Sequence, residues 1–302
     1  MRITQTQIVS DFLYNLNNTQ NRISQLQTQL STGQRVNVPS DDPEAADMIL
    51  RLNVSIGRNE QFTQNVGAAQ SMLSTTTNAL DGVQQLLSQL QVVMAEAGDG
   101  AHATSLGTLG DTVDGILSQA VGLANTEFEG KYVFGGTQTQ APPYVLTPNA
   151  APPPSETVTY NGNGAGIDYP VGEGLTQQAN VTGQAAFGGT SLFDTIIRVR
   201  DELKAGTVPT AADQTAVQNA LNTVLNAAGS AGTIQQSLDA ATAQLTQQHT
   251  QLLALRSAQQ DTDVASATLN LTQEQTTLQA ALAVGAKILP MSLVNFLSST
   301  TS

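Results

Sequence analysis

The sequence predicts a mainly α fold, with long antiparallel helices, terminal coiled-coil arms and a small β-rich insertion in the middle. Near both ends of the chain, apolar residues recur at alternating spacings of three and four over long stretches, which is the pattern of a coiled-coil seam. Seven of the 11 prolines, and most of the Phe and Tyr residues, instead lie between residues 128 and 193. Because proline breaks helices and aromatic residues favour strands, this middle segment predicts β structure and loops.

The first arm is expected to be a helix that ends at Gly33. A second helix is expected to start after Asp42, with Asp42 as the N-cap, Pro43 as the first helical residue and Glu44 in the positive first turn. Asp41, Asp42 and Glu44 are therefore interpreted mainly as helix-capping residues. The apolar seam of the first arm consists of Val9, Phe12, Leu16, Ile23, Leu26 and Leu30.

A second and a third helix are expected before residue 128. The second carries a heptad seam from Phe62 to Met94 and is broken by the Gly98-Asp-Gly100 segment. The third carries apolar residues at helical spacing from Leu106 to Leu123, and the short glycine-containing link predicts that it returns antiparallel to the second.

The middle segment is expected to contain a β-hairpin. Residues 156–160 and 167–171 each alternate in polarity at period two, and residues 161–166 between them contain three glycines. This arrangement predicts two paired strands joined by a glycine-rich turn.

After the middle, the sequence returns to helical patterns. Residues 191–194, Ser-Leu-Phe-Asp, resemble a capping box that opens a helix through about Lys204, and a short helix is expected over 217–225. A long seam follows from Ile234 to Leu255. Another heptad frame contains Val264, Leu271, Leu278, Leu282 and Leu289. Because the phase slips between Arg256 and Asp263, a domain boundary is expected there.

The two boundaries predict a chain that leaves one domain, builds others and returns. We expect residues 1–40 and 262–302 to form a terminal coiled-coil inner domain. Residues 41–134 and 191–261 are expected to form a helical-bundle domain, and residues 135–190 a β-rich insertion that faces outward.

The terminal arms contain very few charges. Residues 264–302 carry only Glu274 and Lys287. Helices with an apolar seam and so few charges need a packing partner in water. We therefore expect the two arms to pair with each other, through the seam residues named above, and to pack on neighbouring copies in an assembly.

Composition excludes several functional classes. The net charge is -13 and the 11 basic residues are scattered, so a nucleic-acid binder is not expected. The chain has no cysteine, no catalytic or metal-ligand histidine spacing, no complete nucleotide motif, no Sec-type signal at residue 1 and no run long enough for a membrane span. No catalytic, cofactor or metal residues are predicted, and no enzyme. A glycan hydrolase that uses Glu156 with Asp168 or Glu173, or a binding module in the insertion, remains an alternative for the middle segment.

Three segments carry a family resemblance. Residues 30–46 end in Asp-Asp-Pro-Glu-Ala-Ala, residues 125–137 read NTEFEGKYVFGGT, and residues 261–297 end in SLVNFL. In this order they resemble the flagellin superfamily of bacteria, in its hook-filament junction branch, and residues 41–44 (Asp41, Asp42, Pro43, Glu44) belong to the family motif. Filament flagellin itself is the alternative, although flagellins usually have Asp-Asp-Ala-Ala-Gly at the first of these positions.

The resemblance implies a structural protein and a set of partners. The arms would line an axial channel as a coiled coil, and the chain would join the ring of hook-associated protein 1 to the first flagellin subunits, beside other copies of itself in a ring. Family members leave the cell unfolded through the flagellar type III system, and their C-terminal arm binds a cytosolic export chaperone. The implied location is extracellular, at the hook-filament junction, with no membrane or nucleic-acid partner.

Overall fold

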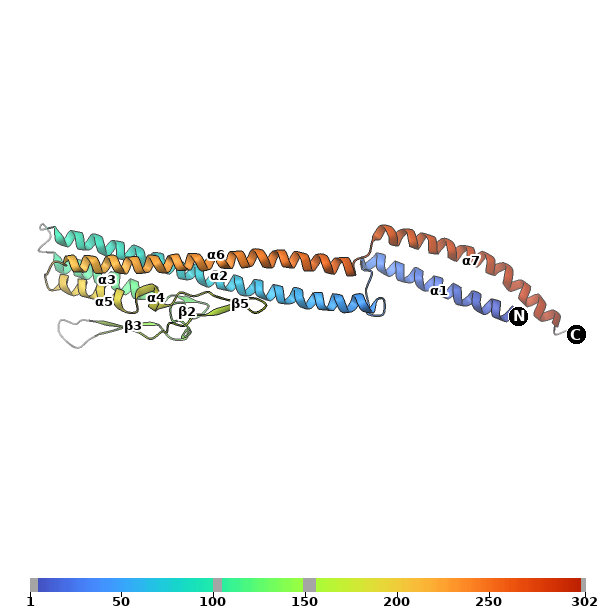
Figure 1. Ribbon diagram of the computed structural model, residues 1–302, viewed down its shortest axis with the longest axis horizontal. Helices are drawn as coiled ribbons and strands as arrows, with labels where there is room; N and C mark the ends of the chain where they lie inside the picture. The colour runs from blue at the N-terminus through green and yellow to red at the C-terminus, as the bar shows by residue number, and fades with distance from the viewer. Residues whose placement is uncertain (1–4, 100–104, 149–155, 300–302) are drawn as a thin grey trace. The chain divides into compact units, whose positions relative to one another are not determined.

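The computed structural model describes residues 5–99, 105–148 and 156–299, and it is mainly helical (Figure 1). Contacts divide the chain into two compact units. One consists of residues 1–58 and 249–302, and the other of residues 59–248. Long helices with a few short strands are the fold class that the sequence predicts. In the part of the chain that the structure describes, no helix is long and apolar enough to cross a membrane.

Four helices form most of the unit of residues 59–248. They are α2 (Pro43–Gly98), α3 (Leu106–Ala124), α5 (Ser191–Lys204) and α6 (Ala211–Gln260), of which α2 and α6 each also contribute one end to the other unit. The predicted seam of α2 is confirmed by burial, because nine of its positions are buried and Phe62 is half-buried. The buried positions are Val66, Ala69, Leu73, Thr76, Leu80, Val83, Leu87, Leu90 and Met94.

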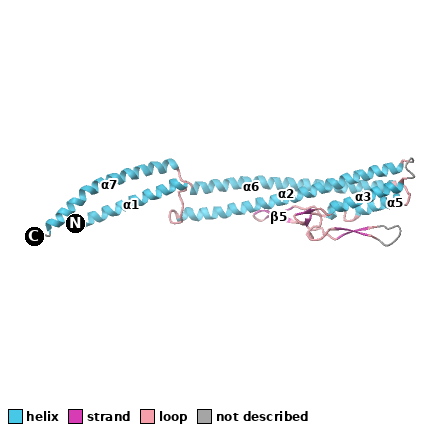
Figure 2. Cartoon of the chain, turned by 180° about the vertical axis from the view of Figure 1, so that it is seen from behind, coloured by secondary structure: helices cyan, strands magenta, loops and turns pink. Residues whose placement is uncertain are grey.

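The strands form three separate antiparallel hairpins along one side of the helices of this unit (Figure 2). The first pairs β1 (Glu127–Phe128) with β2 (Lys131–Tyr132). The second pairs β3 (Tyr144–Thr147) with β4 (Thr157–Tyr160), and the third pairs β5 (Asp168–Gly172) with β6 (Leu175–Gln178).

The predicted hairpin between residues 156–160 and 167–171 is wrong. Both segments are strands, but each pairs with a different partner, β4 with β3 and β5 with β6. The tight reversal lies instead at Glu173-Gly174, where Gly174 has a φ of +72° between β5 and β6. A two-residue turn that ends in glycine matches the twist of a hairpin better than the six-residue segment 161–166 does.

An aromatic cluster fastens the second hairpin to the helices. The ring centroids of Tyr144 and Phe193 lie 4.8 Å apart, as do those of Phe134 and Phe187 at the end of α4 (Gly183–Phe187). The backbone at Tyr144 is also bound by Asn125, the C-cap residue of α3, whose amide accepts from Tyr144 N at 2.9 Å and donates to Tyr144 O at 2.7 Å. The hairpin is therefore part of the hydrophobic core of this unit.

A buried arginine connects the same hairpin to two helices. Arg200 of α5 is 2% exposed, and its guanidinium contacts Asp114 of α3 at 3.0 Å and Glu156 beside β4 at 2.7 Å. Asp201 completes the set at 2.8 Å. Removing the carboxylate partners of a buried cation strongly destabilises the fold, because it leaves an uncompensated buried charge.

The helix after α5 is longer than predicted. The expected short helix over 217–225 and the seam from Ile234 belong to one continuous α6, which starts at Ala211. Thr210 and Asp213 form a capping box at its start: Thr210 Oγ1 accepts from Asp213 N at 3.4 Å, and the Asp213 carboxylate accepts from the N–H and the hydroxyl of Thr210. The predicted span of α5 is correct, but its N-cap is Thr190, whose hydroxyl donates to Asp194 at 2.8 Å.

The other unit contains α1 (Gln5–Thr32) and α7 (Val264–Ser299), which lie side by side (Figure 1). Gly33, with a φ of +72°, ends α1, and α2 starts at Pro43, both as predicted. The break between α6 and α7 covers residues 261–263 and falls inside the predicted interval. These helix ends follow from local capping chemistry.

Candidate functional site

The paired helices α1 and α7 hold most of the residues that the sequence places in a functional role. On α1, the predicted seam residues are the sheltered ones, since Ile23 is 8% exposed and the others are half-buried: Val9, Phe12, Leu16, Leu26 and Leu30. By contrast, Leu13 and Tyr14 are 47% and 68% exposed. The alternating spacing of three and four therefore identified the inner face of α1.

The seam of α7 differs from the predicted one. Leu271 and Leu278 are half-buried as expected, but Val264 and Leu282 are 58% and 52% exposed and lie outside the seam. The seam positions that replace them carry Ala267, Ala281 and Gly285. The prediction counted large apolar residues, whereas two helices approach closely where their residues are small. Leu289 lies outside the residues whose side chains the structure describes.

Gly285 provides space for an aromatic ring. A Cβ built on Gly285 would lie 2.5 Å from Cζ of Phe12, so a larger residue at position 285 would force the Phe12 ring to shift. Phe12 lies near the start of α1 and Gly285 far along α7, as antiparallel helices require. Gly285 is not among the predicted seam residues, because the residue that lies opposite Phe12 is known only once the two helices are paired.

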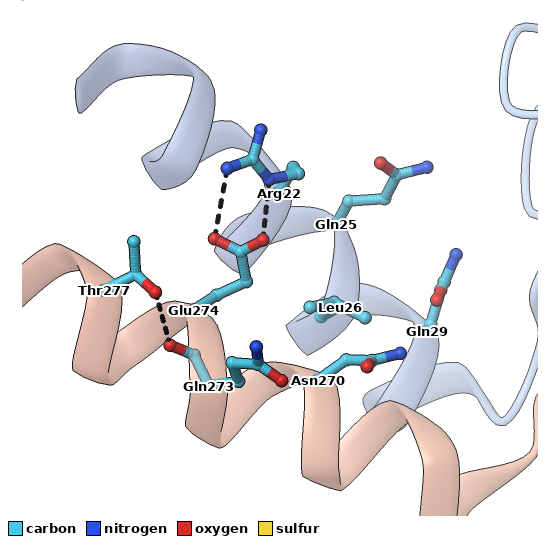
Figure 3. Close-up of a pocket in the computed structure, with 8 residues that line it drawn as sticks. All are labelled: Arg22, Gln25, Leu26, Gln29, Asn270, Gln273, Glu274 and Thr277. Atoms are coloured by element: carbon cyan, nitrogen blue, oxygen red, sulfur yellow. Dashed lines mark hydrogen bonds and ion pairs between the residues drawn. The ribbon is translucent and has the colours of Figure 1, made fainter. Parts of the chain in front are cut away.

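A salt bridge joins the two helices of the pair. The guanidinium of Arg22 contacts Glu274 through two nitrogens, Nε to Oε1 at 2.8 Å and Nη2 to Oε2 at 3.2 Å (Figure 3). Side-chain exposure is 53% for Arg22 and 23% for Glu274. The hydrogen bond to Glu274 raises the pKa of Arg22, so the Arg22 guanidinium keeps its charge. A bidentate contact fixes geometry more than it stabilises at an exposed site.

Amide side chains surround this salt bridge. A groove of about 430 Å³ lies between the two helices, where Gln25, Leu26 and Gln29 of α1 meet Asn270, Gln273 and Thr277 of α7 (Figure 3). The hydroxyl of Thr277 donates to Gln273 O of the same helix at 2.9 Å. Around the Arg22–Glu274 pair, the groove thus presents mostly neutral donors and acceptors, which suit another polar helix surface.

The loops at the near ends of these helices are joined by hydrogen bonds. Thr262 N donates to Gly33 O at 2.9 Å, and Arg35 N donates to Gln260 O at 2.7 Å. The Arg35 guanidinium reaches in two directions, to Gln259 O at 2.9 Å and to Asp42 Oδ2 at 2.8 Å. We call this set of contacts the Arg35 clasp. It ties the end of α6 to the start of α2.

The family-motif residues shape the same region. Asp41 accepts from Asn37 N at 3.0 Å and Val38 N at 3.1 Å, which closes the loop before α2. Asp42 accepts from Ala45 N at 3.0 Å as the predicted N-cap, and this hydrogen bond, with Arg35, lowers the pKa of Asp42. Pro43 and Glu44 are exposed in the first turn of α2.

Asp263 has the corresponding role for α7. Its carboxylate accepts from Ala265 N at 3.0 Å and from Ser266 Oγ at 2.8 Å, and the contacts with Ser266 lower its pKa. Asp42 and Asp263 therefore serve as the caps of α2 and α7. Among the described residues, no group of three or more His, Asp or Glu side chains could hold a metal ion.

The carboxylates considered for hydrolysis do not converge. Glu156 is engaged by the buried Arg200, while Asp168 lies on β5 at a separate cleft. Glu173 lies in the turn between β5 and β6. The geometry gives no support to a pair of catalytic carboxylates.

The fold defines a helical protein whose two ends pair with each other, and the comparisons agree. Residues 3–139 match the bacterial flagellin N-terminal helical region, and residues 214–297 match the bacterial flagellin C-terminal helical region. The chain belongs to the bacterial flagellin family.

Within that family, the curated relatives point to one member type. The chain is 32% identical over 153 residues to flagellar hook-associated protein 3 of Salmonella typhimurium, and 30% identical over 152 residues to that of Escherichia coli K12. Each match covers 48% of this chain and 46% of the relative, so the chain matches less than half of the relatives' length. A solved structure described as a putative flagellar hook-associated protein from Vibrio parahaemolyticus shares the fold. The TM-score is 0.62, with 20% identity over 73% of this chain and 100% of the other.

Proposed function

We propose that this chain is a structural junction protein of the bacterial flagellum, which joins the hook, through hook-associated protein 1, to the flagellin filament. The similarity to hook-associated protein 3 supports this role, and the observation that carries it is the outer surface of the α1–α7 pair. Tyr14 and Leu269 are each 68% exposed there, on helices with very few charges. A surface of this composition favours burial against neighbouring subunits.

In this proposal each predicted domain has its own role in the assembly. Residues 1–40 and 262–302 form the inner assembly domain, residues 41–134 and 191–261 the helical bundle, and residues 135–190 the outward insertion. In this proposal other copies of the chain form a ring, and the exposed Val264 and Leu282 contact neighbours. The chain leaves the cell unfolded through the flagellar type III system, and its C-terminal arm binds an export chaperone in the cytosol beforehand.

Filament flagellin is the competing function. The Asp-Asp-Pro-Glu-Ala-Ala motif at residues 41–46 and the curated relatives favour the junction protein. The two proposals differ in stoichiometry, because a junction protein forms a short connector whereas a flagellin forms long filaments alone.

Complementation tests the proposal. The chain is expressed in a strain that lacks its junction protein, and cells and culture medium are examined for filaments. We expect the strain to shed flagellin into the medium and the chain to restore attached filaments. Filaments that remain attached without the junction gene, or long filaments assembled from this chain alone, would contradict the proposal.

A double substitution tests the assembly residues. Leu26→Asp with Leu278→Asp places two charges in the seam between α1 and α7, so we expect filament attachment to be lost. The matched control is Gln85→Asp with Gln247→Asp, which adds the same charges at exposed positions of α2 and α6, outside the α1–α7 pair. If the seam variant supports attachment as well as the control does, the proposed pairing is wrong.

A further inference from the structure

A cleft in the unit of residues 59–248 has no part in the proposed junction role. It has a volume of about 380 Å³ and lies where α2, the β1–β2 hairpin and the start of β5 meet. Ligand pockets in proteins typically start at about 300 Å³. The cleft is large enough for a small molecule and is lined by residues of both apolar and polar character.

The turn at the edge of this cleft is strained. Glu129 has a φ of +51° and the following Gly130 a φ of +73°, so both turn residues are left-handed. Glycine, asparagine or aspartate usually occupy the first of these positions, and another residue there costs about 1–3 kcal/mol. Glu129 is the one non-glycine residue with positive φ in the described chain, and it lines the cleft. Backbone strain of this kind is often found at functional sites, such as ligand-binding sites.

Two hydroxyl groups of the cleft retain hydrogen-bonding capacity. Tyr169 donates its hydroxyl proton to Met72 Sδ at 3.7 Å, and a thioether is a weak acceptor. Burial, with the nearby Glu129 carboxylate, raises the pKa of Tyr169, so this group stays a donor. Thr137 Oγ1 accepts from Asn163 Nδ2 at 2.7 Å, which leaves the Thr137 proton available for another partner.

The lining combines two kinds of surface. Phe128 and Tyr169 supply aromatic rings, the carboxylates of Glu129 and Asp168 are able to accept hydrogen bonds, and Lys131 offsets one of their two charges. A sugar ring has an apolar C–H face that packs on an aromatic ring and hydroxyls that donate to carboxylates. A strongly charged ligand would meet groups of both signs. We propose that this cleft binds a neutral saccharide.

Saturation-transfer difference NMR on the full chain tests this proposal. The probes are methyl β-glucoside, methyl β-galactoside and N-acetylglucosamine, each supplied alone at millimolar concentration. We expect transfer to the ring protons of at least one sugar. Asp168→Asn removes an exposed acceptor and should weaken that binding by about tenfold or more. Phe128→Leu removes a ring and should have a similar effect.

The control is Asp81→Asn, which makes the same change at an exposed position of α2 away from the cleft and should leave binding unchanged. Absence of transfer to all three sugars overturns the proposal, as does transfer that both cleft variants leave intact. A fourth probe, N-acetyl-lysine methylamide, checks the ligand class. Preferential binding of this cation would overturn the saccharide assignment. The proposal is independent of the junction role, which these measurements do not affect.

Discussion

The ring of Phe12 packs directly on Gly285, so that a Cβ at position 285 would lie 2.5 Å from Cζ and 2.8 Å from Cε1 of the ring. This contact joins α1 to α7 at a point where a side chain at position 285 would meet the ring. Small residues that allow close helix approach are therefore as important to the terminal pair as its leucines.

Gly285→Ala should weaken the α1–α7 pair. Alanine favours a helix over glycine by about 1 kcal/mol, but overpacking against the ring costs about 1–3 kcal/mol. We expect faster hydrogen exchange in both helices and reduced filament attachment. Adding Phe12→Leu to this variant should recover part of the loss, because the smaller side chain makes room for the new methyl group.

Gly57→Ala is the matched control for this substitution. Gly57 is also helical and lies in the same unit, but it is exposed whereas Gly285 is buried, and no atom lies within 4 Å of a Cβ built on it. It should stabilise the protein slightly through helix propensity alone. Equal stabilisation by Gly285→Ala and Gly57→Ala would show that the close contact has no energetic role.

Reversing the Arg22–Glu274 pair should test its role in register. Arg22→Glu or Glu274→Arg alone places like charges together and should loosen α1 and α7, as measured by hydrogen exchange at low salt. The double reversal should restore protection. Arg51→Glu serves as the control, since Arg51 and Asp47 form an exposed pair within one helix. A register role is excluded if the single and double variants exchange alike.

Features set by residues adjacent in the chain could be predicted from the sequence, whereas features set by distant residues could not. Gly33, Asp42 and Pro43 predicted helix ends correctly because capping involves neighbours in the chain. The partner of β4 is β3, across residues 148–156, and alternation alone does not identify a strand's partner.

Two further features lay beyond the sequence pattern for the same reason. The α7 seam uses Ala267 and Gly285, which a count of large apolar residues passes over. The set of carboxylates around Arg200 comes from α3, α5 and the segment before β4, so only the folded chain brings them together.

Arg35→Lys should open the Arg35 clasp while keeping the charge. A lysine ammonium is a point donor, so it should not hold both Asp42 Oδ2 and Gln259 O as the planar guanidinium does. We expect faster hydrogen exchange of two backbone amides: that of residue 35, which donates to Gln260 O, and that of Thr262, which donates to Gly33 O. Arg51→Lys, at an exposed helical position, should leave these amides unchanged. Protection equal to that of the wild type would show that the backbone contacts suffice.

Asp213 should make the helical unit sensitive to acid. Burial alone would raise the pKa of Asp213, but hydrogen bonds from Thr210 and from Arg198 outweigh it and lower the pKa from an ordinary 3.8 to about 2. A lowered carboxylate pKa stabilises the fold above about pH 4, and this stability is lost as the pH falls from about 4 to about 2. The difference corresponds to about 2 kcal/mol.

Asp213→Asn should therefore lower thermal stability at pH 7 and have a smaller effect at pH 2, as followed by circular dichroism. The neighbouring Glu202 provides an opposite control, because burial and the charge of Asp213 raise its pKa. A raised carboxylate pKa destabilises the fold at neutral pH, so Glu202→Gln should increase stability at pH 7 and change little once both residues are protonated. A stability loss of equal size at both pH values for Asp213→Asn would show that its charge is not the cause. The two carboxylates would then act through shape and hydrogen bonding alone.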